Sequence, residues 1–337
     1  MKINTLLDVI VRIFEIQKHR SLLKGSSFLI DRKFKCVSNS NDNIKQYCKK
    51  NLHVSPSKHV NLKIRGGRSG LYDIMLLSNS TTTFRRPSSI RFFDFTNNII
   101  KTIYNDKNKF IVDGTSKLAP CFKTPKILEK HCGNSEFYIK EELIYFKPVS
   151  DWSDTDRTFV IKTVLSDYAN YYKTVVFKKS QIDTTDIPIF LKRELDNQLI
   201  DVNRYYMKAL QHGDLTFNNL LLTYDNDVYF IDFEHEDDFF FLYDIFWIIQ
   251  NDYIYNNNIL LLKKYIKGEY DKDFANLFSS LGINYHPAEK KLYFEIFLCE
   301  MFDKRVRPLS GQNRNIGIKS LERLYTVVKI ISDGGEI

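Results

Sequence analysis

The sequence predicts an α+β fold with two lobes: a small antiparallel-sheet lobe and a larger, mostly helical lobe. Apolar runs of strand length, separated by glycines and a Thr-Asn-Asn turn, occupy residues 59–147. After Pro148 the apolar residues recur at spacings of three and four, which is the period of an amphipathic helix. The chain has 337 residues, of which 43% are hydrophobic, so it is long enough to bury a core in each lobe.

Residues 1–58 precede the strand-rich segment, and we expect them to be a partly helical N-terminal extension. The start of the chain, MKINTLLDVIVRIFEIQKHR, places Leu6, Ile10 and Ile13 on one side of a helix, and its charges interrupt any signal-peptide core. Residues 21–58 are polar and weakly patterned. No uncharged run is long enough to span a membrane, and the five cysteines form no CxxC pair. The sequence therefore favours a cytoplasmic protein.

The individual strands and helices are predicted from the apolar runs of strand length and from the helical spacing of apolar residues. In the lobe at 59–147, strands are predicted from the runs VNLKI, LYDIMLLS, SIRFFDF, IIKTIY and EFYIKEELIYF. A short connection near residues 142–149 leads to the helical lobe at 148–337. Helices of that lobe are predicted at residues 158–172, 189–210, 243–250, 288–302 and 319–331.

Positions 211–238, QHGDLTFNNLLLTYDNDVYFIDFEHEDD, interrupt the helical lobe with a different pattern. Two apolar runs flank an Asp-Asn-Asp turn, so the stretch predicts a β-hairpin. A hairpin holds the residues before its first strand next to those after its second. We therefore expect His212, Asp214 and Asn219 to lie beside Asp232.

Phosphoryl transfer needs this set of groups. It requires a carboxylate to orient and deprotonate the accepting hydroxyl, and oxygen ligands for the Mg²⁺ that bridges the nucleotide phosphates. Asp214 suits the role of base, and the amide oxygen of Asn219 and the carboxylate of Asp232 suit the metal. The alternative is purely structural, because Asp and Asn also cap loops and end strands.

The segments HGDLTFNN and FIDFE resemble the catalytic loop and metal-binding segment of the aminoglycoside phosphotransferase and choline kinase superfamily, relatives of the protein kinases. The family pattern reads H-G-D-x-x-x-x-N, then an apolar strand ending in I-D-[FW]-E. Every fixed position is matched, by His212, Gly213, Asp214, Asn219, Ile231, Asp232, Phe233 and Glu234. Glycine at position 213, where protein kinases usually carry Arg, points to the branch that acts on small molecules.

The resemblance implies a bilobal protein-kinase-like fold and a role for each residue of the motif. His212 and Asp214 would be the catalytic residues, with Asp214 as the base. Asn219 and Asp232 would hold Mg²⁺. In the family, a Tyr-Asp pair at the start of a later helix braces the catalytic loop, and Asp244 occupies that position here.

Such a fold also implies a strand lysine that holds the nucleotide phosphates, positioned by a helix carboxylate. Lys101, in the run IIKTIY, is the candidate lysine, and Asp113 is its candidate partner, although the family more often has Glu there. A solvated strand lysine is the alternative for Lys101.

The segment RGGRSGLYDI resembles a phosphate-covering glycine loop between two strands. Backbone N–H groups of Gly66, Gly67 and Gly70 would then lie near the phosphates, but an ordinary hairpin turn explains the pattern equally well. Adenine would contact the backbone of the connection, near Glu141 to Leu143.

The predicted function is transfer of the γ-phosphate of ATP or GTP, with Mg²⁺, to a hydroxyl of a small polar acceptor. The acceptor would be a sugar, an aminosugar, an amino alcohol or a glycan of the cell envelope. An acidic run from Glu234 to Asp238 could bind a cationic acceptor or could be a solvated loop. The sequence does not predict the oligomeric state.

The charge is divided unevenly along the chain. Residues 1–150 hold 27 Lys+Arg and 12 Asp+Glu, a net charge of +15, and the remainder holds 22 and 29, a net of −7. The basic half could attract nucleotide phosphates, an anionic membrane surface at the inner face or nucleic acid, or could serve solubility alone.

Two other functions stay open. One is a Ser/Thr protein kinase-like enzyme, against which Gly213 and the lack of an A-P-E segment after Asp232 argue. The other is a kinase-like scaffold that binds a polyanion through its basic half. A scaffold would not explain why the set of catalytic-motif residues is complete, so nucleic acid is not favoured as a partner.

Overall fold

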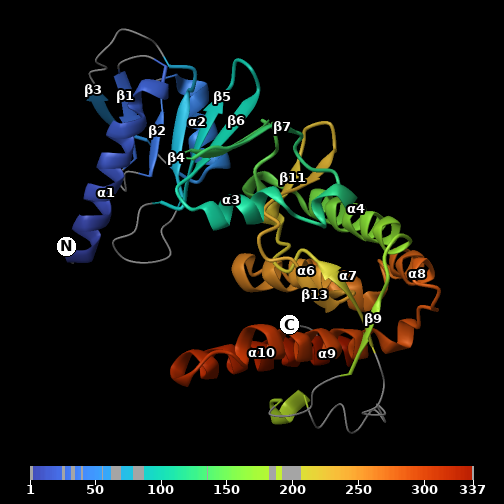
Figure 1. Cartoon of the computed structure of the whole chain (residues 1–337). Helices are drawn as coiled ribbons and strands as arrows, with labels where there is room; N and C mark the ends of the chain where they lie inside the picture. Colours follow the sequence, from blue (N-terminus) through green and yellow to red (C-terminus); the bar gives the residue numbers. More distant parts are fainter. Residues whose placement is uncertain are drawn as a thin grey trace. The chain divides into compact units, whose positions relative to one another are not determined.

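The computed structural model describes residues 3–24, 27–31, 35–38, 41–54, 56–61, 70–78, 87–134, 136–181, 187–191 and 206–335. The chain divides into two compact units. The sheet unit comprises Met1–Lys117, Lys123–Asp151 and Leu221–Tyr229, and the helical unit comprises Leu118–Phe122, Trp152–Leu220 and Phe230–Ile337. The predicted α+β class, with a sheet-containing part and a mostly helical part, is confirmed (Figure 1).

Within the described residues, the sheet unit has eight antiparallel strands in the order β3-β1-β2-β4-β5-β6-β8-β7. The strands are β1 (Ser27–Ile30), β2 (Cys36–Ser38), β3 (Lys58–Asn61), β4 (Ile74–Leu77), β5 (Ser89–Asp94), β6 (Ile99–Tyr104), β7 (Ile127–Cys132) and β8 (Phe137–Glu142). The apolar runs correctly predict β4, β5, β6 and β8. Strand β7 escapes the pattern because all of its residues are exposed.

We expected residues 1–58 to be an N-terminal extension. They belong instead to the sheet unit. Strands β1 and β2 lie inside the sheet, and β2 pairs with β4 through the register Val37↔Met75. These strands are only four and three residues long, so they carry too little period to be recognised in a polar segment.

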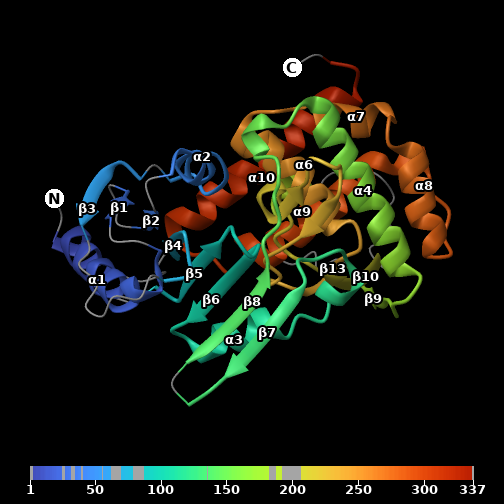
Figure 2. The same cartoon turned by 90° about the horizontal axis from the view of Figure 1, so that it is seen from above.

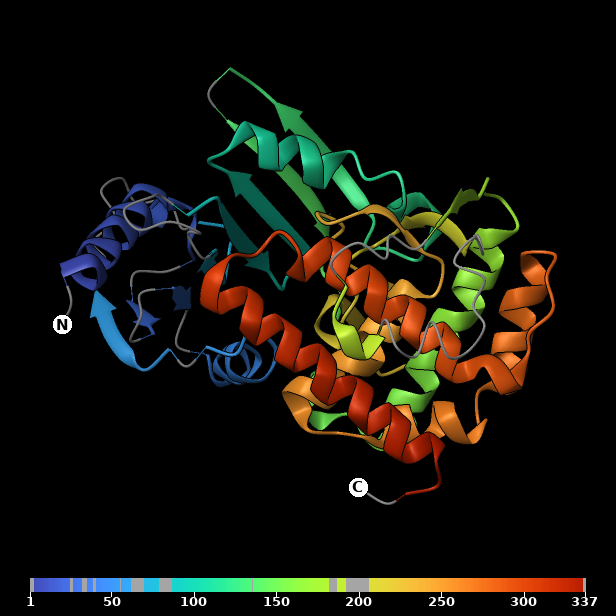
Figure 3. The same cartoon turned by 90° about the horizontal axis from the view of Figure 1, so that it is seen from below.

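Among the described residues, the α-helices of the sheet unit are α1 (Ile3–His19), α2 (Asp42–Asn51) and α3 (Lys107–Gly114). Successive strand residues point to opposite faces of the sheet, so each helix meets one face. Ile16 of α1 packs on the face that carries Phe92, whereas Cys48 of α2 packs on the face that carries Phe93. Helix α3 lies across β6 and β8 (Figure 3), where Phe110 packs on Tyr104.

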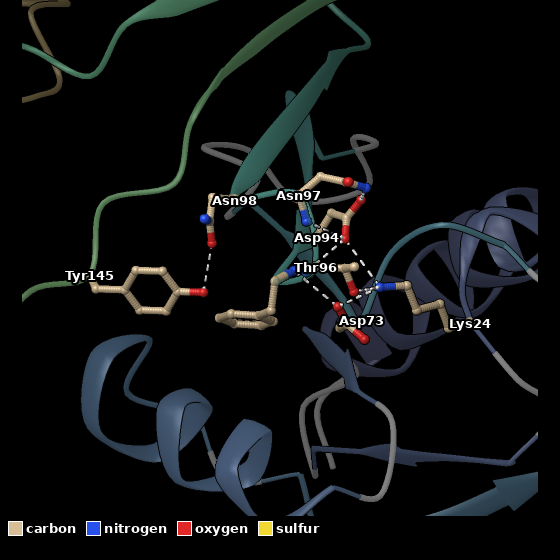
Figure 4. Close-up of polar contacts among 8 residues, drawn as sticks. Lys24, Asp73, Asp94, Thr96, Asn97, Asn98 and Tyr145 are labelled. Carbon is tan, nitrogen blue, oxygen red and sulfur yellow. Dashed lines mark hydrogen bonds and ion pairs between the residues drawn. The ribbon is translucent and has the colours of Figure 1, made fainter.

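A polar network joins the first segment of the chain to the β5–β6 turn (Figure 4). The Lys24 ammonium lies 3.0 Å from Asp73 and 3.1 Å from Asp94, and it donates to the Thr96 hydroxyl at 2.8 Å. Asp73 and Asp94 are both buried, at 6% and 3% exposure. Asp94 also accepts from the Asn97 side chain at 2.6 Å. Lys24 therefore supplies a positive charge next to two buried carboxylates.

The same turn contacts the segment that follows β8. The Tyr145 hydroxyl donates to the Asn98 side chain at 3.0 Å, and the Leu143 N–H donates to the Asn98 carbonyl at 2.8 Å. Helix α2 reaches this segment too, because Asn51 donates to the Phe146 carbonyl at 3.0 Å. The first 58 residues thus help to hold the connection that leads out of the sheet.

The helical unit is built around α6, where Phe246 is fully buried. Its ring lies 5.1 Å from Tyr265, 5.2 Å from Phe294 and 5.6 Å from Phe297, measured between ring centroids. Helix α4 lies beside α8 (Figure 2). The α-helices in the described part of this unit are α4 (Asp154–Tyr172), α6 (Tyr243–Asn256), α7 (Leu260–Lys267), α8 (Asp271–Ser280), α9 (Lys290–Met301) and α10 (Gly311–Ser332). Among the described residues, no helix combines the length and apolarity needed to cross a bilayer.

The predicted helix at 189–210 is wrong at its C-terminal end. Residues Tyr206–Gln211 form strand β10, which pairs antiparallel with β9 (Lys178–Ser180) and β13 (Asp237–Phe240). Met207 and Leu210 have helical spacing, but the backbone groups of this segment are satisfied across the strands, and that pairing decides the structure. Residues 192–205 of the predicted helix lie outside the described part of the chain.

We expect Lys24→Met to lower the free energy of unfolding by about 1–3 kcal/mol, because two buried carboxylates lose their cation. Burial alone would raise the pKa of Asp94, but hydrogen bonds from Asn97 and Lys24 lower it below its usual value. A lowered folded-state pKa stabilises the fold above the unfolded value of about 3.9, and this contribution is lost as the pH falls through the folded value. The deficit should therefore be full at pH 7 and shrink toward pH 3.

Urea denaturation at both pH values measures this. The matched control is Lys45→Met on α2, whose partner Asp42 is 93% exposed, so we expect a loss below about 0.5 kcal/mol. Equal losses for both variants, or a Lys24→Met deficit that is constant with pH, would contradict the role given to Lys24.

Candidate active site

The site of the helical unit lies in the loop after β10 and at the two ends of a β-hairpin, whose residues Leu221–Tyr229 belong to the sheet unit. Strands β11 (Leu220–Leu222) and β12 (Val228–Phe230) form the predicted hairpin, whose turn is closed by a 2.8 Å bond from the Thr223 N–H to the Asp227 carbonyl. Beyond the strands, the Ile231 N–H donates to the Asn219 carbonyl at 3.1 Å. The hairpin therefore brings Asn219 next to the residue after Ile231, which is Asp232, as predicted from the sequence.

Asp244 holds the loop that precedes the hairpin. Its carboxylate accepts the backbone N–H of His212 at 2.7 Å and that of Gly213 at 2.9 Å. The Tyr168 hydroxyl of α4 donates to the same carboxylate. Asp244 is fully buried, and burial raises its pKa, while His212 and these hydrogen bonds favour the ionised form. Asp244 therefore holds two backbone N–H groups of the loop.

Gly213 occupies a position that a side chain cannot fill. Its φ is +78°, and a Cβ there would lie 2.2 Å from the His235 carbonyl oxygen and 2.8 Å from the Phe239 ring. The chain turns left-handed here while passing close to another backbone segment, and only glycine tolerates both. This is a local structural reason for glycine at position 213.

His212 was expected to be catalytic, but the structure gives it a different part. The ring is fully buried, and its Nε2 donates to the Ile231 carbonyl at 2.8 Å. It also contacts the Phe233 ring, with centroids 4.8 Å apart. A group enclosed in this way cannot meet a substrate, so His212 ties the loop to the segment around Asp232 and positions both.

Asp214 and Asn219 are half-buried and oriented by hydrogen bonds. The Asn219 amide nitrogen donates to the Asp214 carbonyl at 2.7 Å, which turns the amide oxygen of Asn219 away from the loop backbone. One carboxylate oxygen of Asp214, Oδ1, accepts the indole N–H of Trp247 at 3.2 Å. For the other oxygen, Oδ2, the described part of the chain provides no hydrogen-bond donor.

Asp232 is exposed and lies directly after the hairpin, with φ at +67°. This left-handed conformation costs a residue other than glycine about 1 kcal/mol, and such strain is concentrated at functional sites. The described residues contain no group of three or more His, Cys, Asp or Glu side chains that could hold a metal. One amide oxygen and one carboxylate fit Mg²⁺, which is bound by one or two protein oxygens with phosphates and water, and do not fit a closed zinc site.

The acidic run after Glu234 is largely paired within the unit. Asp237 lies 2.7 Å from the Lys304 ammonium, and Asp238 pairs with Lys178. Glu236 accepts the Leu118 N–H at 3.0 Å. Because the two lysines balance two of the four carboxylates of the run, the run gives less support to the idea of a cationic acceptor.

Lys101 lies on β6 as predicted, but its surroundings differ from the prediction. Its ammonium is 3.0 Å from Glu136 and 3.9 Å from the centre of the Tyr138 ring. Helix α3, which carries the predicted partner Asp113, packs on Tyr104, and this residue points to the opposite face of the sheet from Lys101. The side chain of Asp113 lies outside those described. Strand alternation therefore argues against the Lys101–Asp113 pair.

The predicted phosphate loop does not join neighbouring strands. Gly66 and Gly67 lie outside the described residues, and β1 and β2 separate β3 from β4 in the sheet. The Gly70 N–H donates to the Leu23 carbonyl at 3.1 Å, and a Cβ at Gly70 would lie 2.1 Å from the Leu22 carbonyl carbon. Gly70 thus permits a close approach of two backbones, and this approach explains the glycine.

The predicted adenine contact, near Glu141 to Leu143, coincides with the end of β8. Glu141 pairs with Ile100 of β6, and the Leu143 N–H is already donated to the Asn98 carbonyl at 2.8 Å. The Leu143 N–H is therefore occupied by the sheet, and adenine contact at these residues stays a prediction.

Sequence reasoning missed two residues that contact the loop, Trp247 and Arg305. Trp247 lies on α6, four residues after Tyr243, and the two rings stack with centroids 5.6 Å apart. Arg305 donates to the Gly213 carbonyl, and its guanidinium lies 5.2 Å from the centre of the Trp247 ring. The spacing of Trp247 from Asp244, one helical turn, is a signal that could have found it.

No protein-family model and no curated protein matches the chain. Solved structures similar to it include a choline/ethanolamine kinase family protein from Mesorhizobium loti, at 10% identity and a TM-score of 0.42, covering 77% of this chain and 92% of that one. An ethanolamine kinase from Plasmodium vivax is similar at 14% identity and a TM-score of 0.41, covering 71% and 80%.

A third similar structure is a thermostable mutant of aminoglycoside phosphotransferase APH(4)-Ia in a ternary complex with ADP and hygromycin B. It has 9% identity and a TM-score of 0.42, and the match covers 75% of this chain and 93% of that one.

We expect Gly213→Ala to unfold the loop and lower the melting temperature well beyond the effect of a strained backbone alone. Gly282→Ala is the matched control, because Gly282 also has a positive φ, +70°, but a Cβ there meets nothing within 4 Å. The control should lose about 1–2 kcal/mol, and Gly213→Ala should lose several kcal/mol more from the clash with His235. Thermal denaturation compares them, and equal losses would contradict the close approach at Gly213.

Proposed function

We propose that the chain is a Mg²⁺-dependent phosphotransferase of the aminoglycoside phosphotransferase and choline kinase superfamily. It would move the γ-phosphate of ATP or GTP to a hydroxyl of a small polar acceptor. The observation that carries the proposal is the arrangement of three oxygen-bearing side chains, Asp214, Asn219 and Asp232, on one braced loop and hairpin.

Asp214 would act on the acceptor. Its free oxygen, Oδ2, accepts the proton of the acceptor hydroxyl as that oxygen bonds to the γ-phosphorus. The bond from the γ-phosphorus to the bridging oxygen breaks, the nucleoside diphosphate leaves with that electron pair, and the proton passes from Asp214 to solvent. Because Asp214 is held by the Trp247 indole, little reorganisation is needed at the moment of transfer.

Asn219 and Asp232 would hold the metal through the amide oxygen and the carboxylate. The metal, when bound, would supply positive charge that neutralises the charge developing on the phosphates. The contact between the Asn219 amide nitrogen and the Asp214 carbonyl supports this role, because it fixes which end of the amide faces outward. Asp244 would keep the Asp214 carboxylate and the Asn219 amide in a fixed relative position, because it holds the loop backbone at His212 and Gly213.

The acceptor is proposed only by class: a neutral or weakly charged polyol, sugar or amino alcohol. The pairing of Asp237 with Lys304 and of Asp238 with Lys178 removes the main argument for a strongly cationic one. Lys101, with Glu136 as its carboxylate partner, remains the candidate for phosphate contact on the sheet unit.

We expect Mg²⁺·ATP or Mg²⁺·GTP to raise the melting temperature of the wild type, and Asp232→Ala to abolish the shift because a metal ligand is lost. A ligand at about 100 times its Kd stabilises the fold by about 2.7 kcal/mol, or roughly several degrees for a chain of this size. Asp214→Asn should keep the shift, because the base does not hold the metal, and should lose transfer.

The matched control is Asp225→Ala, an exposed aspartate in the hairpin turn, which should keep the full shift. The measurement is a thermal titration of all four proteins with each nucleotide. Absence of a shift in the wild type with both nucleotides would remove the proposed function, and a full shift in Asp232→Ala would remove Asp232 from the metal site.

A further inference from the structure

Helix α6 contacts the loop of the proposed base twice. Asp244 in its first turn holds the backbone of the loop, and Trp247, three residues later, donates its indole N–H to Oδ1 of Asp214 at 3.2 Å. Residues three apart on a helix lie on the same side, so one rigid element fixes both the backbone and the carboxylate. The proposed phosphotransfer reaction assigns no part to Trp247 beyond this contact.

The indole itself is held on both sides. The Tyr243 ring stacks on it at 5.6 Å with an angle of 15° between the planes, and the guanidinium of Arg305 lies 5.2 Å from its centre. Arg305 also donates to the Gly213 carbonyl, next to the proposed base. Arg305 lies in a π-helical turn, Phe302–Val306, and such turns insert a residue into a helix and occur often at functional sites.

We propose that Trp247 is a positioning residue for the Asp214 carboxylate, and that Arg305 positions Trp247. The inference rests on the proposed function. An aspartate carboxylate turns readily about its last side-chain bond, and only one orientation presents Oδ2 to an acceptor. With Oδ1 fixed by the indole N–H, the base is preorganised, and misplacement by about 1 Å can cost as much as 100-fold in rate. Trp247 thus acts on the reaction through Asp214 without touching the acceptor.

The chemical change that tests this is Trp247→Phe. Phenylalanine keeps an aromatic ring between Tyr243 and Arg305 and removes the N–H. With water as the phosphate acceptor, release of ADP from Mg²⁺·ATP measures the reaction without knowledge of the natural acceptor. We expect kcat to fall about 10- to 100-fold and the KM for ATP to stay within about twofold, since nucleotide binding does not use the indole.

A double-mutant cycle separates positioning from loss of structure. In the Asp214→Ala background, the indole has no carboxylate to hold, so Trp247→Phe should have no further effect on the residual rate. A merely structural role would lower the rate by the same factor in both backgrounds. Arg305→Lys, which keeps the charge but loses the planar contact with the indole, should lower kcat in the same direction as Trp247→Phe.

The indole N–H can also be observed directly. The chain has two tryptophans, so a ¹H–¹⁵N spectrum gives two indole signals, and the one absent from Trp247→Phe is that of Trp247. We expect the hydrogen exchange of this indole N–H to accelerate in Asp214→Ala. It should be unchanged in the control Asp232→Ala, because the indole does not contact the Asp232 carboxylate.

The outcomes distinguish the two proposals. If the wild type releases ADP and Trp247→Phe releases it at the same rate, the positioning role is overturned but the proposed function is not. Equal hydrogen exchange of the indole N–H in Asp214→Ala and in the wild type would have the same consequence. A wild type that neither binds nor turns over Mg²⁺·ATP would overturn the proposed function and, with it, any part for Trp247 in transfer.

Discussion

The carboxylate of Asp244 is the interaction on which the rest of the site depends. A loop with a left-handed glycine has backbone N–H groups that no helix or sheet satisfies. Here two of these N–H groups donate hydrogen bonds to the buried Asp244 carboxylate. Burial raises the pKa of the Asp244 carboxyl, and the His212 charge, the Tyr168 hydroxyl and the N–H groups of His212 and Gly213 oppose that rise by favouring the charged form. Loop and anion therefore stabilise each other.

The loop that Asp244 holds then positions the other side chains of the site through hydrogen bonds. The loop backbone fixes Asp214, and Asn219 is tied back to the Asp214 carbonyl. The His212 ring crosses to the Ile231 carbonyl, so the residue that follows, Asp232, is positioned by the same loop. Each of these steps is a hydrogen bond to backbone, and the Oδ1 atom of Asp214 is held separately, by the Trp247 indole.

Local pattern predicted the hairpin and the two halves of the fold, because each has a signal within a few residues. The bracing role of Asp244 was predicted from a family resemblance, not from spacing. Strand β10 was predicted as helix, because Met207 and Leu210 have helical spacing and their pairing partner in β13 lies some thirty residues away. Arg305 could not have been found, since a π-helical turn shifts the register of every side chain that follows it.

Neither compact unit is a continuous stretch of chain, and this sets an order for folding during synthesis. The sheet unit includes Leu221–Tyr229, so it cannot be completed until that hairpin has emerged, long after β8. The hairpin closes onto the connection through the Lys147 N–H, which donates to the Leu222 carbonyl at 2.7 Å. A nascent chain ending before residue 220 therefore carries an unfinished domain, and contacts of such long sequence separation form slowly.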